Sequence, residues 1–312
     1  MLIKDNFKGV LFGIGSLILI GIQPIIANSR PSEIDAYLFA MMTVIYQALI
    51  FLPLLILERK SLHNIQENSE TIIISKQLKG WRKHIKLLIY LGINFAIAQV
   101  LFYVAYRLAG AINASLAQKT TVIFGLLFGF LINHEKISVS QIFFSVLLLF
   151  GVILAVTDGS FNLLEFNIGV IIMIATTILW MLAHALTKPI LEKKEISSIQ
   201  LVFIRNFLNG AILIMTYFLF YPLENIKLIV NPVNQFFFIL MGFVYGFDLF
   251  CWYLSLKYID ISTASIIIAP SPIITAIIAT IFLGDNFTFF HVLGTVIIII
   301  SIIFIVKKKS QS

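Results

Sequence analysis

The chain has 312 residues, of which 60% are hydrophobic and 12% are charged, and its mean hydropathy is +1.01. Soluble domains are about 45–50% apolar and about 25% charged, so this composition excludes a water-soluble globular protein and predicts a membrane protein. The net charge of +7 does not indicate nucleic-acid binding, because the basic residues stand between apolar runs and form no solvated basic face.

Apolar runs of about 20 residues, the length that a membrane-spanning helix needs, alternate with short polar turns along the chain. We interpret the first run as a retained helix and not a signal peptide, because no small-residue cleavage site follows it. The one sizeable polar insertion, 58–84, is predicted to be a cytoplasmic loop that anchors the following helix at the inner face. The runs predict ten transmembrane helices, at 8–28, 36–57, 85–107, 111–132, 139–157, 167–187, 199–220, 235–257, 262–283 and 287–306.

The basic residues predict how these helices are oriented, because cytoplasmic loops carry an excess of Lys and Arg. With the N-terminus inside, seventeen of the 22 Lys and Arg residues lie on inside segments. Only Arg30, Arg107 and Lys227 lie on outside segments, while Lys119 and Arg205 fall within helices. We therefore expect both termini in the cytoplasm.

The segment 103–136 recurs at 253–286 without a gap, at an offset of 150 residues. Small, basic, hydroxyl and acidic residues follow one order in both copies, and such self-similarity predicts a repeated architecture. The matched pairs are Arg107 and Lys257, Ser115 and Ser265, Thr121 and Ser271, and Glu135 and Asp285.

The repeat predicts two halves, 1–157 and 158–312, each with five helices. Because five is an odd number, the second half is expected to enter the membrane upside down relative to the first. In such inverted repeats the binding site lies near the midplane, where the halves meet. The predicted fold class is therefore an all-α polytopic membrane protein of ten helices in two inverted five-helix repeats.

The most specific motif in the second half reads Leu-Lys-Tyr at 256–258, Ser-Thr-Ala-Ser at 262–265, two prolines, and Phe-Leu-Gly-Asp at 282–285. With Trp180 in the sixth helix and Arg205 in the seventh, it resembles the drug/metabolite transporter superfamily, and specifically its ten-helix EamA-type permeases. The resemblance implies a secondary transporter that exports a small organic molecule across the plasma membrane of a prokaryote.

The first half departs from this pattern. Val122 replaces the proline, Tyr46 stands where Arg205 stands in the second half, and the first helix has no tryptophan. The two halves are therefore not expected to contact substrate equivalently.

Three charged residues are predicted at bilayer depth, where a charge costs about 2.5–3.5 kcal/mol on insertion scales and tends to face a wet cavity. Asp248 is either a proton-coupling or cation-recognising carboxylate or the structural partner of a basic group. Lys119 is either the counter-charge of a substrate carboxylate or phosphate, or a partner of Asp248 or of carbonyl groups. Arg205 is interpreted first as a structural guanidinium that ties helices together and second as part of the site.

Uncharged candidates complete the predicted site. Gln118 is a candidate cavity residue, although interhelical hydrogen bonding explains it equally well. Tyr103 and Trp252 are candidates for an aromatic wall, although aromatic residues also gather at membrane interfaces without function. Pro270 and Pro272 free backbone groups in the ninth helix and are expected to permit a gate or hinge.

Other polar residues are given structural interpretations. His184 is expected to pack at the inner membrane interface, and Glu135 and Asp285 to act as helix caps or gate latches. Tyr106 and Tyr245 are further candidates for the aromatic wall.

The sequence contains no Gly-rich phosphate loop, no His-Glu-x-x-His zinc pattern and no Gly-x-Ser-x-Gly elbow. We therefore expect no enzyme activity, no cofactor and no metal ion. The predicted function is alternating-access transport of an amino-acid-like zwitterion or anion, with membrane lipids and protons as further partners and a monomer or homodimer as the assembly. The alternatives are a lipid or lipid-linked sugar flippase of the same fold and a non-transporting intramembrane enzyme.

Overall fold

The computed structural model describes residues 2–68, 72–161, 167–222, 225–284 and 287–309, and all secondary structure in these residues is helical. The first half contains α1 (Leu2–Ser29), α2 (Ala36–Asn68), α3 (Ile72–Lys83), α4 (Ile85–Ala117), a 3-10 turn η1 (Gln118–Thr120), α5 (Thr121–Asn133) and α6 (Val139–Val156). The second half contains α7 (Ile168–Glu192), α8 (Ser198–Phe220), α9 (Ile226–Val230), α10 (Pro232–Tyr258), α11 (Ile261–Ile267), α12 (Ser271–Phe282) and α13 (Phe289–Lys309).

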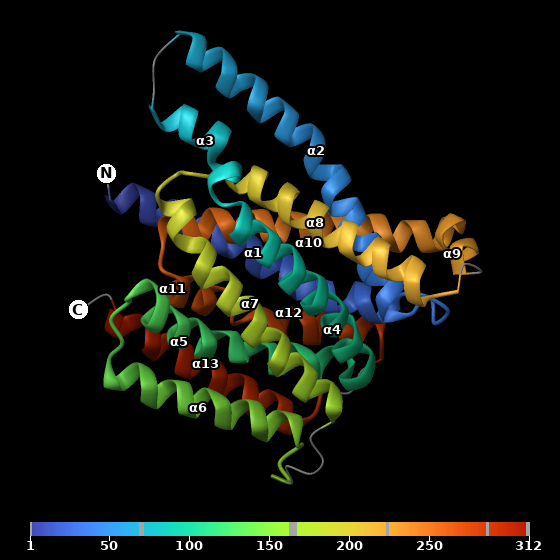
Figure 1. The fold of residues 1–312 in the computed structure, drawn as a ribbon. Helices are drawn as coiled ribbons and strands as arrows, with labels where there is room; N and C mark the ends of the chain where they lie inside the picture. The colour runs from blue at the N-terminus through green and yellow to red at the C-terminus, as the bar shows by residue number, and fades with distance from the viewer. Residues whose placement is uncertain (1, 69–71, 162–166, 223–224, 285–286, 310–312) are drawn as a thin grey trace.

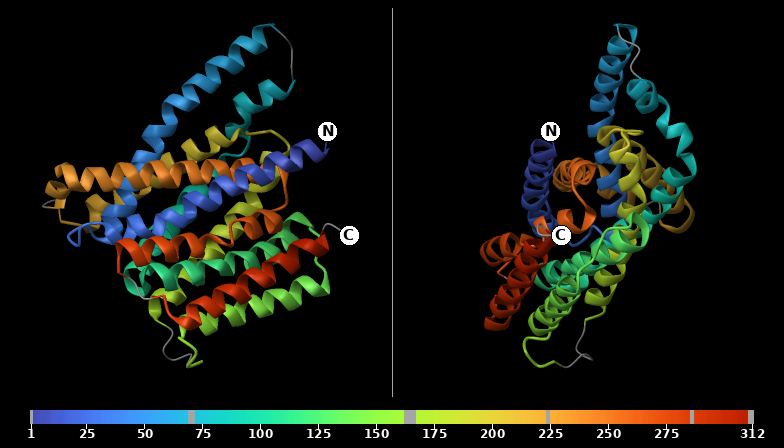
Figure 2. Two further views of the ribbon diagram at one scale, coloured as in Figure 1. Left: turned by 180° about the vertical axis from the view of Figure 1, so that it is seen from behind. Right: turned by 90° about the vertical axis from the view of Figure 1, so that its left-hand side faces the viewer.

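Seven helical segments of the described chain are long and apolar enough to cross a membrane. Two shorter apolar helices, Val139–Ala155 and Phe289–Ser301, lie within α6 and α13. Together they form a multi-pass bundle, in which α6 and α13 lie side by side along one edge (Figure 2). These two helices can approach closely because Gly151 has no side chain. A Cβ atom at this position would lie only 2.9 Å from the carbonyl oxygen of Gly294.

The segment 58–84, predicted as a cytoplasmic loop, is largely helical in its described residues. The helix α2 continues to Asn68 and α3 occupies Ile72–Lys83, so both project from the bundle as a helical extension (Figure 1). The polar composition of this segment reports that it is solvated, but its Glu, Lys, Gln and Leu residues are good helix formers. Gly80 has the lowest helix propensity of its residues.

The predicted fourth and ninth helices are each interrupted. The turn η1 separates α4 from α5, and a turn at 268–270 separates α11 from α12. Pro272 lies in the first turn of α12, where proline needs no backbone donor, and this position explains why α11 does not continue. In the first half no proline stands at this place, and Thr120 instead donates its hydroxyl to the carbonyl of Ala117.

A second pair of breaks lies eight residues, or about two helical turns, before the first pair. Gly110 interrupts α4 with φ 76° and ψ 172°, a conformation that favours glycine. The equivalent position in the second half, Asp260, is the extended residue between α10 and α11. Both pairs of breaks therefore obey the 150-residue offset that the repeat predicts.

Packing follows the same two-fold pattern. The contact between α1 and α10 is matched by that between α7 and α4, and the contact between α1 and α12 by that between α7 and α5. Across the halves, Glu135 accepts hydrogen bonds from the amide of Ile261 at 3.0 Å and the hydroxyl of Ser262 at 2.5 Å. This carboxylate thus caps the N-terminus of α11, while its predicted counterpart, Asp285, lies outside the described residues.

Candidate functional site

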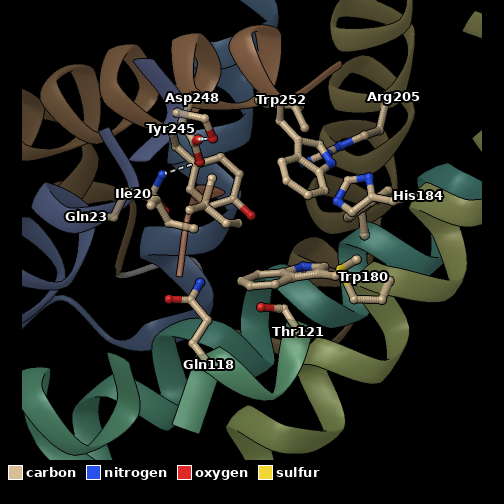
Figure 3. Close-up of a pocket in the computed structure, with 15 residues that line it drawn as sticks. Ile20, Gln23, Gln118, Thr121, Trp180, His184, Arg205, Tyr245, Asp248 and Trp252 are labelled. Carbon is tan, nitrogen blue, oxygen red and sulfur yellow. Dashed lines mark hydrogen bonds between the residues drawn. The ribbon is translucent and has the colours of Figure 1, made fainter. Parts of the chain in front are cut away.

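A small cavity lies between the two halves, at the level of the helix breaks (Figure 3). The space open to the centre of a water molecule is about 50 Å³. One water needs about 10–15 Å³ on this measure, so the cavity has room for a few waters and not for an organic ligand. Its walls are Ser16, Ile20, Gln23, Phe95, Gln118, Thr121, Trp180, Met181, His184, Arg205, Tyr245, Asp248, Leu249, Trp252 and Ile268.

Asp248 forms the acidic side of the cavity. Its two carboxylate oxygens accept hydrogen bonds from Ser16 Oγ at 2.5 Å and from Gln23 Nε2 at 2.7 Å, both on α1. These polar residues are seven positions apart, two helical turns, and so they share one face of an otherwise apolar helix. Sequence reasoning missed both, although this spacing was the available signal.

Arg205 forms the basic side, and its side chain is fully buried. The guanidinium carbon lies 3.7 Å from the centre of the Phe95 ring, and Nη1 donates to Tyr253 Oη at 3.4 Å. No residue in the described part of the chain accepts a hydrogen bond from Nε or Nη2. Asn206 and Asn209, the neighbours expected to extend an arginine network, also lack hydrogen-bond partners there.

Aromatic rings connect the two charged sides (Figure 3). His184 was expected at the membrane interface, but it lines the cavity, with its ring centre 5.4 Å from that of Phe95 and 5.3 Å from that of Trp252. Phe102 packs behind Trp180 and Tyr245, with its ring centre 5.2 Å from that of Trp180 and 5.8 Å from that of Tyr245. The aromatic side of the cavity therefore includes Trp252 and Tyr245, two of the candidates named from the sequence, together with His184 and Trp180.

The buried polar atoms that face this cavity without a partner are mostly donors. Trp180 Nε1, Trp252 Nε1 and Gln118 Nε2 have no acceptor among the described residues, like the two Arg205 nitrogens. A buried donor without a partner costs about 1–3 kcal/mol, so the cavity is suited to a ligand that supplies acceptor oxygens. The carboxylate of Asp248, in contrast to these donors, already has hydrogen-bond partners in Ser16 and Gln23.

Lys119 does not line the cavity. Its ammonium donates to Ser271 Oγ at 2.5 Å and to the carbonyl of Ile268 at 3.4 Å. Within the described residues no ion pair joins it to Asp248, the partner that the sequence left open. Lys119 lies in the break at 118–120, and its two partners lie in and directly after the equivalent break at 268–270. Lys119 therefore links the two helix breaks, one from each half.

Tyr103 also lies behind the cavity wall. Its hydroxyl donates to Thr43 Oγ1 at 3.3 Å and accepts from Gln99 Nε2 at 3.2 Å. Its ring packs edge-on against Phe39 and Phe102, with centres 4.7 and 5.1 Å apart. The two prolines, Pro270 and Pro272, flank the break between α11 and α12 and do not face the cavity.

The family model of EamA-like transporters matches residues 7–157 and 167–307. The chain belongs to this family. It is 28% identical over 113 residues to an uncharacterized transporter from Methanothermobacter thermautotrophicus (strain ATCC 29096 / DSM 1053 / JCM 10044 / NBRC 100330 / Delta H). That match covers 35% of this chain. The chain spans about a third of the length of this relative, because the match covers 33% of it.

A solved structure titled only as the crystal structure of a protein superposes with a TM-score of 0.70 and 11% sequence identity. The superposition covers 97% of this chain and 99% of that one, and at this identity it shows a shared fold alone. The resemblance inferred from the sequence is confirmed by the family match, and the chain is a multi-pass membrane protein of a transporter family.

Proposed function

We propose that this EamA-family transporter carries a small organic metabolite with a carboxylate or similar oxyanion, most favourably an amino-acid-like zwitterion, through the central cavity. The observation that carries the proposal is the set of buried donors without acceptors around that cavity. Arg205, with Nε and Nη2 free, would bind the oxyanion in the forked geometry that guanidinium groups favour.

The opposite side of the cavity suits an ammonium group. Asp248 uses both oxygens on Ser16 and Gln23, but an ionised carboxylate has about four lone-pair sites and can accept further donors. Trp252 and Tyr245 lie between the two charged groups, and Trp180 lies across the cavity from them, near Thr121 (Figure 3). A zwitterion with an apolar or aromatic side chain matches this order of groups.

The size of the cavity supports the proposal of alternating access. Sites for small organic ligands occupy about 300–1,000 Å³, whereas the cavity here is about 50 Å³. The described conformation is therefore contracted around the site, and substrate entry requires the halves to move. The proposed hinges are the break at 118–120 and the break at 268–270, which contains Pro270 and is followed by Pro272, since interrupted helices form the sites of many transporters.

The proposed topology has ten spans. Breaking the 49-residue apolar segment Ile85–Asn133 at Gly110 gives two spans, and α6 and α13 add two more. The two halves, 1–157 and 158–312, would be inverted repeats with both termini in the cytoplasm, as the distribution of Lys and Arg predicts. The proposed setting is the plasma membrane of a prokaryote, with export driven by the substrate gradient or by protons.

The test is flux into proteoliposomes of purified protein, with a labelled mixture of amino acids and a second mixture of organic acids. Faster uptake than in protein-free liposomes, lost in Gln118→Leu and retained in Lys227→Gln on the exposed α9, supports the proposal. No uptake of either mixture, together with movement of a labelled lipid between leaflets, would instead assign the protein as a flippase.

A further inference from the structure

A second pocket, away from the central cavity, brings two arginine side chains together at the connection between α1 and α2. Its volume, as the space open to the centre of a water molecule, is about 190 Å³, enough for a carboxylate or a phosphate group. The basic-residue pattern predicts that this end of the bundle faces outward. Its walls are Ala27, Asn28, Arg30, Pro31, Ser32, Ile34 and Arg107.

Arg30 is held in a fixed position. Its Nε donates to the carbonyl of Ile34 at 3.2 Å, its Nη1 donates to the carbonyl of Ala27, and its guanidinium lies 5.2 Å from the centre of the Phe39 ring. A guanidinium has five N–H donors, so these contacts leave Nη2 available to a ligand. Burial lowers the pKa of Arg30, Tyr103 and the Asp35 carboxylate act against this lowering, and the nearby Arg107 guanidinium adds to it.

No acidic side chain of the described residues forms an ion pair with either arginine. The acidic residues of the same connection are engaged elsewhere, since Asp35 accepts from the amide of Leu38 and Glu33 accepts from Asn234. Arg107 is exposed, and its guanidinium donates to no residue in the part of the chain that the structure describes. Two like charges thus share one pocket in which neither forms an ion pair with an acidic side chain of the described residues, and the carboxylate that acts on Arg30 is that of Asp35.

We propose that Arg30 and Arg107 form an oxyanion-binding site at the outer mouth, separate from the central cavity. Forked guanidinium donors bind carboxylate and phosphate groups, and an anion between them would offset their mutual repulsion. The oxyanion belongs either to a free ligand in solution or to the headgroup of an anionic lipid. The site is independent of the proposed transport function, because binding there requires no movement of substrate.

Aromatic rings separate this site from the central cavity. Arg30 stacks on Phe39, Phe39 contacts Tyr103, and Tyr103 contacts Phe102, which packs behind Trp180 of the cavity wall. An anion bound at the arginines therefore lies outside this layer of rings, and it has no contact with the groups around Asp248.

The first experiment measures phosphate binding by the thermal shift of purified protein at constant ionic strength, with chloride as the reference anion. A saturable rise in Tm is expected for wild type, since a ligand of the folded state stabilises it. Arg107→Gln, at an exposed position without contacts to lose, should need an about tenfold higher phosphate concentration for the same rise. Lys227→Gln removes an exposed charge on α9 and should match wild type.

The second experiment separates the two sources of the oxyanion. Nanodiscs of phosphatidylglycerol and of phosphatidylcholine are compared, and a Tm advantage of phosphatidylglycerol that disappears in Arg107→Gln identifies a lipid headgroup. Charge reversal in Arg107→Glu should raise the Tm without ligand, by replacing repulsion of Arg30 with attraction, and should abolish phosphate binding. If wild type and Arg107→Gln respond alike to both phosphate and phosphatidylglycerol, the proposal is overturned.

Discussion

Replacing Arg205 with methionine tests whether this buried guanidinium serves binding or merely holds helices together. In wild type the group stacks on Phe95 at 3.7 Å and makes one long hydrogen bond, of 3.4 Å, to Tyr253. Losing a desolvated cation–π contact costs about 2 kcal/mol, and losing the hydrogen bond costs about 1 kcal/mol.

The substitution also removes two buried nitrogens, Nε and Nη2, that have no acceptor among the described residues. Each such donor costs about 1–3 kcal/mol, so their removal offsets the lost contacts. Arg205→Met is therefore expected to change the free energy of unfolding by less than about 2 kcal/mol while abolishing transport.

The assay pairs the thermal shift of purified protein with flux of the labelled amino-acid mixture in proteoliposomes. Arg82→Met is the matched control, because Arg82 also stacks on an aromatic ring, Trp81 at 5.3 Å, but is exposed on α3 and does not line the cavity. It should keep both stability and flux. A loss of about 3–5 kcal/mol in Arg205→Met, the cost of breaking a buried charged pair, would refute the reasoning and show a structural tie.

Three further predictions concern other charged groups. Asp248→Asn should flatten any pH dependence of flux while the protein stays folded, and an unchanged pH profile would remove Asp248 from coupling. Lys119→Gln should slow flux without changing the apparent KM, because Lys119 ties Ser271 and Ile268 and does not face the cavity; a raised KM would place it in binding. The hydrogen bond from Lys83, aided by His84, holds the pKa of Glu195 below its ordinary value of 4.5, so wild type should be more stable than Glu195→Gln at neutral pH. The ion pair contributes about 1 kcal/mol at most to the free energy of unfolding, as exposed pairs do. Since that stabilisation is lost as pH falls through the lowered folded pKa, the Tm difference between wild type and Glu195→Gln should vanish in acid; a constant difference would exclude the ion pair as its cause.

Much of the fold could be predicted from the sequence, because hydropathy is a local property and the repeat is a matter of spacing. The offset that pairs Thr121 with Ser271 also pairs the two helix breaks that precede them. The break at 118–120 itself was not predicted, since an apolar run with Val122 in place of proline reads as continuous helix. The helical extension after 58 was missed because polar composition reports solvation and not conformation.

The candidate site was less accessible to sequence reasoning. Asp248 and Arg205 could be selected because charges at bilayer depth are costly, and both line the cavity. Lys119 was selected because it is also a charge at bilayer depth, but it does not line the cavity. The 3-10 turn at 118–120 sets the direction of its side chain, and this turn was not predicted. His184 was placed at an interface because its depth was judged from helix ends alone, whereas the bundle carries it beside Phe95.

The central claim, that access to the cavity alternates between the two sides of the membrane, can be measured at a single position. Thr121 lines the cavity, and its hydroxyl has no hydrogen-bond partner in the described chain, so Thr121→Cys is a conservative probe. It would be made in the Cys251→Ser background, which removes the only native cysteine. A membrane-impermeant maleimide should label Cys at this position from either face of oriented vesicles, and the amino-acid mixture should shift the ratio of the two rates. Labelling from one face only, unchanged by the mixture, would contradict alternating access.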